Sequence, residues 1–177
     1  DENNLVNKKM RIYKHVKDKK LKYQYQRFKK VKISFQLIKK LFEESKKNKI
    51  DFCVTPFDVE YIHQLKRYVK FFKVASGDLN NIDMLRAIAS TKKKVVISTG
   101  MSNLQEIKKA ISFFPKKNVV LLHCISCYPT KENDANLINI KTLKDKFGLE
   151  VGYSDHTSGI DAAANAIFFG ATIIEKH

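Results

Sequence analysis

A repeat that begins at residue 50 limits the folds open to this chain more than any other feature. Short apolar runs, rich in β-branched and aromatic residues, alternate from there with longer segments of helical spacing. The runs are IDFCV (50–54), FFKVA (71–75), VVIS (95–98), VVLLHC (119–124), LEVGYS (149–154) and ATIIE (171–175). Strands buried on both faces read as continuous apolar runs, so the alternation predicts βα units and a parallel sheet.

The spacing of the runs favours one of two architectures built from such units. Successive runs start 21 to 30 residues apart, close to the repeat of a (β/α)8 TIM-type barrel. A doubly wound open sheet is the competing architecture, although no G-x-G-x-x-G follows a strand to give its dinucleotide-binding form. Six strands would leave a barrel two short, so we expect an α/β barrel that is incomplete in this chain.

Three segments have the apolar spacing of amphipathic helices: residues 33–48, 58–69 and 103–114, the last with Ser102 as a plausible N-cap. No convincing strand precedes residue 50. We therefore divide the chain into a basic lead-in at 1–32, loop-like or partly helical, and a partial barrel domain at 33–177.

The formal charge of +16 raises the question of nucleic-acid binding. Residues 1–50 hold 17 Lys and Arg against 5 Asp and Glu, whereas residues 51–177 hold 17 against 13. The excess is thus an N-terminal property, and a solvated surface is the simpler interpretation than a nucleic-acid site at residues 8–32. Sparse cysteine, a polar start and the lack of a membrane-length apolar run predict a cytoplasmic protein that binds no membrane.

Polar side chains follow every apolar run. Those that follow or end the runs include Thr55, Lys73, Ser76, Asp78, Ser98, Ser126, Tyr128, Ser154, His156 and His177. The carboxyl ends of parallel strands meet at one edge, so we expect one site there. Small hydroxyls, loop amides and a strand lysine are suited to binding a phosphorylated substrate. Two imidazoles on neighbouring strands are suited to binding a divalent metal ion, although they do not by themselves determine which metal binds.

Six ordered motifs carry a resemblance to a known family. They are TPFD, KVASGDLNN, VVISTGM, LLHCxSxYP, VGYSDHTxGI and IIEKH, and they extend over the predicted barrel domain. In this order they resemble the sialic acid synthase family. Its members condense phosphoenolpyruvate with an N-acetylated amino sugar, such as N-acetylmannosamine or the precursors of legionaminic and pseudaminic acid, and release phosphate.

The resemblance implies a role for each matching residue. His156 and His177 match two histidines that hold Mn²⁺ or Mg²⁺. Asp78 stands where the family more often has a glutamate that contacts the amino sugar, and Tyr128 matches a tyrosine that lines the sugar pocket. The phosphate and carboxylate of phosphoenolpyruvate would be held by Thr55, Lys73, Ser76, Ser98, Ser126 and Ser154. Lys73 and Asp78 are the expected catalytic residues.

The chain also departs from the family pattern. Two initial strands, one with an acidic and Asn-His motif and one ending in Lys-Phe-Gln, are missing, as is a C-terminal antifreeze-like domain. We therefore expect strands three to eight of the barrel, and a homodimer for the full-length form. The alternatives are a different sugar specificity (legionaminate, pseudaminate or a spore-coat-type homologue) and an inactive truncated remnant or binding module of the same fold.

Most of the cysteines and of the remaining histidines are expected to have ordinary structural roles. Cys124 and Cys127 form a C-x-x-C at a strand end, where no helix start lowers a thiol pKa, which argues against redox or zinc chemistry. His15 and His63 are not expected to be ligands. His123 is a candidate contact either to the substrate or to the residues that bind it, and Asp155 could orient His156.

Overall fold

The computed structural model describes residues 8–11, 22–30 and 32–177, and these residues fall into two compact units that divide between Phe52 and Cys53. The first unit contains helices α2 (Gln24–Lys30) and α3 (Phe35–Lys47). His15 and much of the basic lead-in lie outside the described residues. No helix within the described ranges is long and apolar enough to cross a membrane.

Helix α3 confirms the helix predicted at residues 33–48. The Ser34 hydroxyl accepts a hydrogen bond from the Leu37 amide at 3.2 Å, which satisfies one of the free donors at the start of the helix. The boundary between lead-in and barrel, predicted after residue 32, stays a prediction, although contacts divide the chain after Phe52. Among the described residues before Cys53 there is one isolated antiparallel bridge, Arg11–Tyr23, and no strand.

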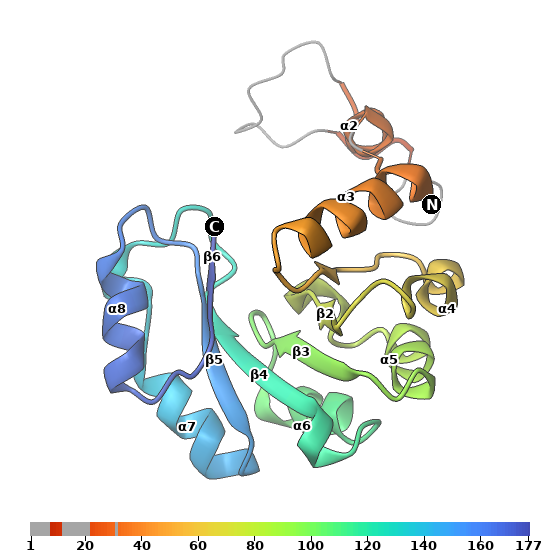
Figure 1. Ribbon diagram of the computed structural model, residues 1–177. Coiled ribbons are helices and arrows are strands. Elements are labelled where there is room, and N and C mark those ends of the chain that lie inside the picture. The colour runs from red at the N-terminus through yellow and green to blue at the C-terminus, as the bar shows by residue number, and fades with distance from the viewer. Residues whose placement is uncertain (1–7, 12–21, 31) are drawn as a thin grey trace. The chain divides into compact units, whose positions relative to one another are not determined.

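The second unit is built on six parallel strands, and every apolar run that was predicted to be a strand overlaps one of them. They are β1 (Cys53–Val54), β2 (Phe71–Val74), β3 (Lys94–Ser98), β4 (Val119–Cys124), β5 (Glu150–Asp155) and β6 (Ile174–Lys176). The strands pair in sequence order, and the sheet curls into half a barrel (Figure 1). A doubly wound sheet reverses its strand order at a switch point, so this order excludes that alternative.

Helices cover the outer face of the curled sheet (Figure 1). They are α4 (Ile62–Leu65), α5 (Ile82–Ser90), α6 (Leu104–Ile111), α7 (Ile138–Phe147) and α8 (Asp161–Phe168). On the inner face, Val96, Val120 and Leu122 form a buried cluster with Phe71 and Ile173 packed against it. Because side chains alternate along a strand, the residues between these positions point outward, toward the helices.

Two local predictions were wrong. Residues 58–69 do not form one helix: a 3₁₀ turn at Val59–Tyr61 is followed by the four-residue α4, and Val59 is 37% exposed. The other three residues of the predicted apolar face, Ile62, Leu65 and Val69, are buried, so the spacing marked buried positions without a continuous helix. Helix α6 is capped by Asn103 and not by Ser102, because Asn103 takes part in a capping box with Glu106, in which each side chain accepts from the other's backbone amide.

Candidate functional site

Lys73 lies at the centre of a polar cluster formed by the ends of the strands. Its side chain is buried, and Nζ donates a hydrogen bond to Ser98 Oγ at 2.7 Å. The same ammonium lies 3.4 Å from Glu175 Oε2. Strands β2, β3 and β6 supply these three residues, so the curl of the sheet brings together side chains that are far apart in the sequence.

Glu175 was missed as a site residue, although it stands in the IIEKH motif. Ser154 lies opposite it in the β5–β6 register and donates its hydroxyl to Glu175 Oε1 at 2.6 Å. Burial opposes ionisation of the carboxyl, but this hydrogen bond and the nearby Lys73 charge prevail and lower the pKa of Glu175 below its usual value. The carboxylate therefore links the lysine to the serine within one ionised network.

His156 is held in one tautomer by the backbone. Its Nδ1 lies 2.6 Å from the carbonyl oxygen of Ile125, which can only accept, so Nδ1 carries a proton. Nε2 lies 3.2 Å from Ser154 Oγ, whose proton is directed to Glu175. Burial, aided by His177, lowers the pKa of His156 and so favours the neutral ring, whose Nε2 could bind a cation in place of its present contact with Ser154 Oγ.

His177 lies against His156, with ring centroids 4.6 Å apart and planes at 79°. Its Nε2 lies 3.2 Å from Glu175 Oε1, the pairing of carboxylate and imidazole that commonly orients metal-ligating histidines. Tyr128 stacks on His156 with centroids 3.9 Å apart and meets His177 edge-on at 5.6 Å. This tyrosine is 66% exposed, so it covers the two imidazoles from the solvent side.

The donor chemistry of the two imidazoles fits a divalent metal ion. Each ring has one nitrogen directed at an acceptor, Ile125 O for His156 and Glu175 for His177, and the other nitrogen left as a candidate ligand. Within the described part of the chain, no group of three His, Cys, Asp or Glu side chains is arranged to hold a metal. Two protein ligands would thus leave the other coordination positions to water or substrate, as in an open catalytic site.

Gly100 marks a second part of the site, where three small polar side chains converge. Its amide donates to Ser76 Oγ at 3.1 Å, and Ser76 Oγ lies 3.2 Å from Cys124 Sγ. A Cβ at Gly100 would lie 2.4 Å from Ser126 Oγ and 2.9 Å from both Cys124 Sγ and Ser76 Oγ. Only glycine leaves these groups free to face one small space, a requirement that the sequence reasoning did not detect.

Thr55 and Asp78 are less closely tied to the cluster. Thr55 follows β1 and is partly exposed, and Asp78 ends the 3₁₀ turn that begins at Ser76. Burial raises the pKa of Asp78, against the effect of a hydrogen bond from Asn81. In the ranges that the structure describes, no hydrogen bond joins either side chain to Lys73 or to the histidines.

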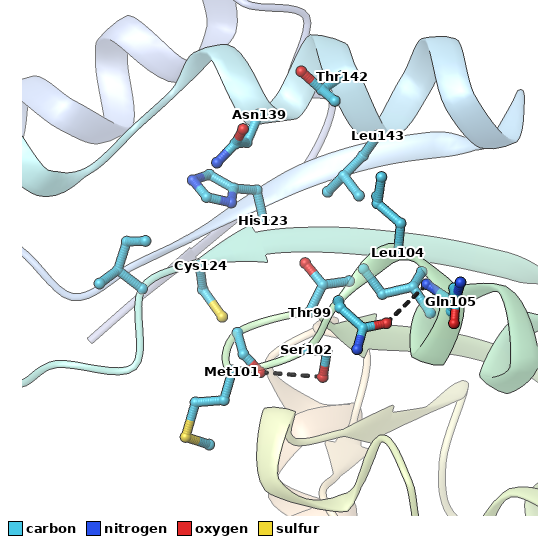
Figure 2. A pocket seen from close by; sticks show the side chains of 14 residues that line it. Thr99, Met101, Ser102, Leu104, Gln105, His123, Cys124, Asn139, Thr142 and Leu143 are labelled. Carbon is cyan, nitrogen blue, oxygen red and sulfur yellow. Dashed lines mark hydrogen bonds between the residues drawn. The ribbon is translucent and has the colours of Figure 1, made fainter.

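The His123 side chain lies on the outer face of β4, away from the polar cluster on the inner face, so its predicted contact with the site is not made. Its Nε2 lies 2.8 Å from the carbonyl oxygen of Ala135, and its ring stacks on Tyr153 at 5.8 Å. It lines a pocket of about 770 Å³ between residues 99–105, which run from the loop after β3 into the start of α6, and helix α7 (Figure 2). None of the predicted site residues lines this pocket.

The predicted direct contact between Asp155 and the His156 ring is not made, because the Asp155 side chain points to the other face of β5. It is fully buried, and Lys176 Nζ lies 3.0 Å from its Oδ2. Burial opposes its ionisation, but the Thr157 amide and the lysine prevail and lower its pKa. The cysteines at positions 53, 124 and 127 are free thiols, and burial raises the pKa of Cys53 to about 11.

Comparison with known proteins identifies the chain's relatives. The NeuB family model matches residues 1–177. The chain is 44% identical over 145 residues to N,N'-diacetyllegionaminic acid synthase of Campylobacter jejuni, a match that covers 78% of this chain and 43% of that protein. It is 38% identical over 141 residues to pseudaminic acid synthase of the same species, covering 77% and 41%.

A solved structure agrees in fold. The crystal structure of N-acetylneuraminic acid synthetase from Leptospira borgpetersenii superposes with a TM-score of 0.82 at 42% identity, covering 86% of this chain and 55% of that one. The chain thus spans less than half the length of the two sequence relatives. Because the family model matches residues 1–177, the chain belongs to the NeuB family.

Proposed function

We propose that this chain supplies the phosphoenolpyruvate-binding and metal-binding side of a synthase that condenses phosphoenolpyruvate with an N-acetylated amino sugar. The observation that carries the proposal is the connected cluster of Lys73, Ser98, Glu175, Ser154 and the paired imidazoles at one edge of the sheet. A buried ammonium among hydroxyl donors is a binding environment for phosphate and carboxylate groups.

Lys73 and the surrounding hydroxyls would hold the anionic substrate. The lysine now contacts Ser98 and Glu175, so on binding it would turn part of its hydrogen-bonding capacity from the carboxylate to the substrate. Ser76 and Ser126 would bind from the space beside Gly100. Ser154 and Thr55 complete the proposed set of contacts to phosphate and carboxylate.

His156 and His177 would hold the divalent ion, Mn²⁺ or Mg²⁺, beside the sugar. Bound there, such an ion supplies Lewis acidity to the aldehyde oxygen. Carbon 3 of the enol phosphate would form a bond to the aldehyde carbon as the C=C and C=O π bonds break, and the aldehyde oxygen would take up a proton to become a hydroxyl. Water would add at the electron-poor carbon 2 and lose its protons, and phosphate would leave by carbon–oxygen cleavage, so that carbon 2 becomes a ketone. The chain's own contribution is positioning and electrostatic stabilisation, with Tyr128 and Asp78 facing the sugar.

The acceptor sugar is one of several N-acetylated amino sugars. The relatives are named for different products, legionaminic acid and pseudaminic acid among them. A homodimer and a cytoplasmic location stay predictions.

Phosphate release measures the proposed reaction directly. With Mn²⁺ present, we expect release that requires phosphoenolpyruvate together with one of N-acetylmannosamine or the diacetylated precursors. Lys73→Met should abolish it, whereas Lys141→Met should not, because Lys141 pairs with Asp145 on the exposed face of α7. If the folded chain releases no phosphate with any of these sugars, the proposal gives way to an inactive remnant or a binding module of the same fold.

A further inference from the structure

We propose that the Asp155–Lys176 ion pair positions the two histidines, by fixing the register of the two strand ends that carry them. Each histidine directly follows one member of the pair: Asp155 precedes His156, and Lys176 precedes His177. The inference rests on the proposed metal site and adds to it two positioning residues that touch neither metal nor substrate.

The alternation of side chains separates the pair from the histidines. His156 contacts Ser154 and His177 contacts Glu175, each two residues earlier in the chain, so these four side chains share the inner face. Asp155 and Lys176 lie between them in sequence and therefore point to the outer face. The ion pair and the imidazole pair are thus on opposite faces of the same two strand ends.

The register makes the two pairs geometrically dependent on each other. Asp155 lies directly opposite Lys176 in the β5–β6 ladder, and the last backbone bond of that ladder runs from the His177 amide to the Asp155 carbonyl oxygen at 3.2 Å. A slip of one residue would send the side chains that follow to the wrong face. Strand β6 has only three residues, so few ladder bonds oppose such a slip.

The ion pair is only partly exposed, because the Asp155 side chain is fully buried while that of Lys176 is 36% exposed. Asp155 is fully buried, its Oδ1 accepts from the Thr157 amide at 2.9 Å, and Lys176 Nζ also donates to the Thr157 carbonyl oxygen. Among the described residues no hydrogen bond reaches Asp155 Oδ2, and the ammonium 3.0 Å away supplies the opposite charge beside it, while the Tyr153 hydroxyl also interacts with the carboxylate. The lysine of β6 thereby holds the backbone that follows His156.

The test compares Lys176→Met, which keeps the length of the side chain and removes its charge, with Lys176→Arg, which keeps the charge. The first readout is the nuclear Overhauser effect between the ring protons of His156 and His177 in the metal-free chain. We expect a cross-peak in the wild type, a several-fold weaker one in Lys176→Met and in Asp155→Asn, and recovery in Lys176→Arg.

The second readout is the dissociation constant for Mn²⁺, measured by the electron paramagnetic resonance signal of the free ion. Loss of partners outside the ligand set weakens metal binding by about 10–100-fold, and we expect Lys176→Met to fall in that range. Lys141→Met removes an exposed ion pair of the same 3.0 Å length and should bind as the wild type does. Ile140→Ala, a fully buried change on α7, should lower stability without weakening Mn²⁺ binding.

The outcomes separate this proposal from the proposed metal site. A wild-type cross-peak and wild-type Mn²⁺ affinity in both Lys176→Met and Asp155→Asn would overturn the positioning role. If the wild type binds no Mn²⁺ but its cross-peak still depends on Lys176, the metal site fails and the positioning role stands. A loss in Ile140→Ala equal to that in Lys176→Met would assign the effect to general destabilisation and overturn the proposal.

Discussion

Replacing Gly100 by alanine tests the small polar space beside the site. The new Cβ would lie 2.4 Å from Ser126 Oγ, which is exposed and can rotate away. Cys124 Sγ and Ser76 Oγ, both at 2.9 Å, have less freedom, because the thiol is buried and the serine accepts from the Gly100 amide. Overpacking costs about 1–3 kcal/mol and a lost hydrogen bond about 0.5–1.5, so we expect a loss of about 2–4 kcal/mol in the free energy of unfolding.

The assay is urea denaturation of Gly100→Ala beside Gly77→Ala. No atom lies within 4 Å of a Cβ built on Gly77, so this control should be neutral or gain about 0.4–1 kcal/mol through the unfolded chain. Adding Cys124→Ala to Gly100→Ala removes the buried sulfur from the contact, and we expect part of the loss to be recovered as a coupling energy. If the free energy of unfolding of Gly100→Ala lies within about 0.5 kcal/mol of the wild-type value, the space beside Gly100 is not closely packed, since that is the range of substitutions that meet no obstacle.

Three further predictions concern the fold around the site. Gly152→Ala would bring a Cβ to 2.4 Å from the backbone oxygen of Ile173, a contact that no side-chain rotation relieves. We therefore expect a larger fall in melting temperature than for Gly77→Ala. Equal melting temperatures of the two variants would contradict this. Asn103→Ala removes both hydrogen bonds that its side chain accepts at the start of α6, and it should lower the free energy of unfolding in urea by about 0.5–2 kcal/mol. Ser102→Ala should leave that free energy nearly unchanged. A larger loss in Ser102→Ala than in Asn103→Ala would identify Ser102 as the cap. Burial lowers the pKa of His123, so below about pH 6.5 the unfolded chain binds the extra proton and the free energy of unfolding falls as the pH falls. His123→Leu should show a smaller difference in unfolding free energy between pH 7.5 and 5.5, and an unchanged difference would rule out this histidine as its source.

The strands were predictable because burial on both faces leaves a direct mark on the sequence. The run VVLLHC matches β4 residue for residue, since every one of its positions is buried. The residues that follow the strands were predictable for a related reason, as parallel strands bring their carboxyl ends to one edge. Pairing in chain order then placed Lys73 beside Ser98.

What the sequence did not reveal depends on long-range contacts. Glu175 gains its role from Lys73 and Ser154, and Gly100 from the three side chains that converge on it, so neither carries a local signal beyond its motif. His123 is different, because strand alternation counted from the inward Leu122 would have sent it to the outer face. The short α4 shows that apolar residues at helical spacing can be buried without a continuous helix, because the spacing carries no information about backbone hydrogen bonds.

Titration of phosphoenolpyruvate into the chain by calorimetry tests most directly whether the strand ends form one anion-binding site. We expect the wild type to bind phosphoenolpyruvate, and Lys73→Met should weaken that binding by at least about tenfold, since a hydrogen bond to a charged group contributes about 1.5–3 kcal/mol. Lys141→Met, which removes an equal charge from the exposed face of α7, should bind as the wild type does. Equal affinity in Lys73→Met and the wild type, or no binding by the folded wild-type chain, would mean that the strand ends do not form one anion-binding site around Lys73.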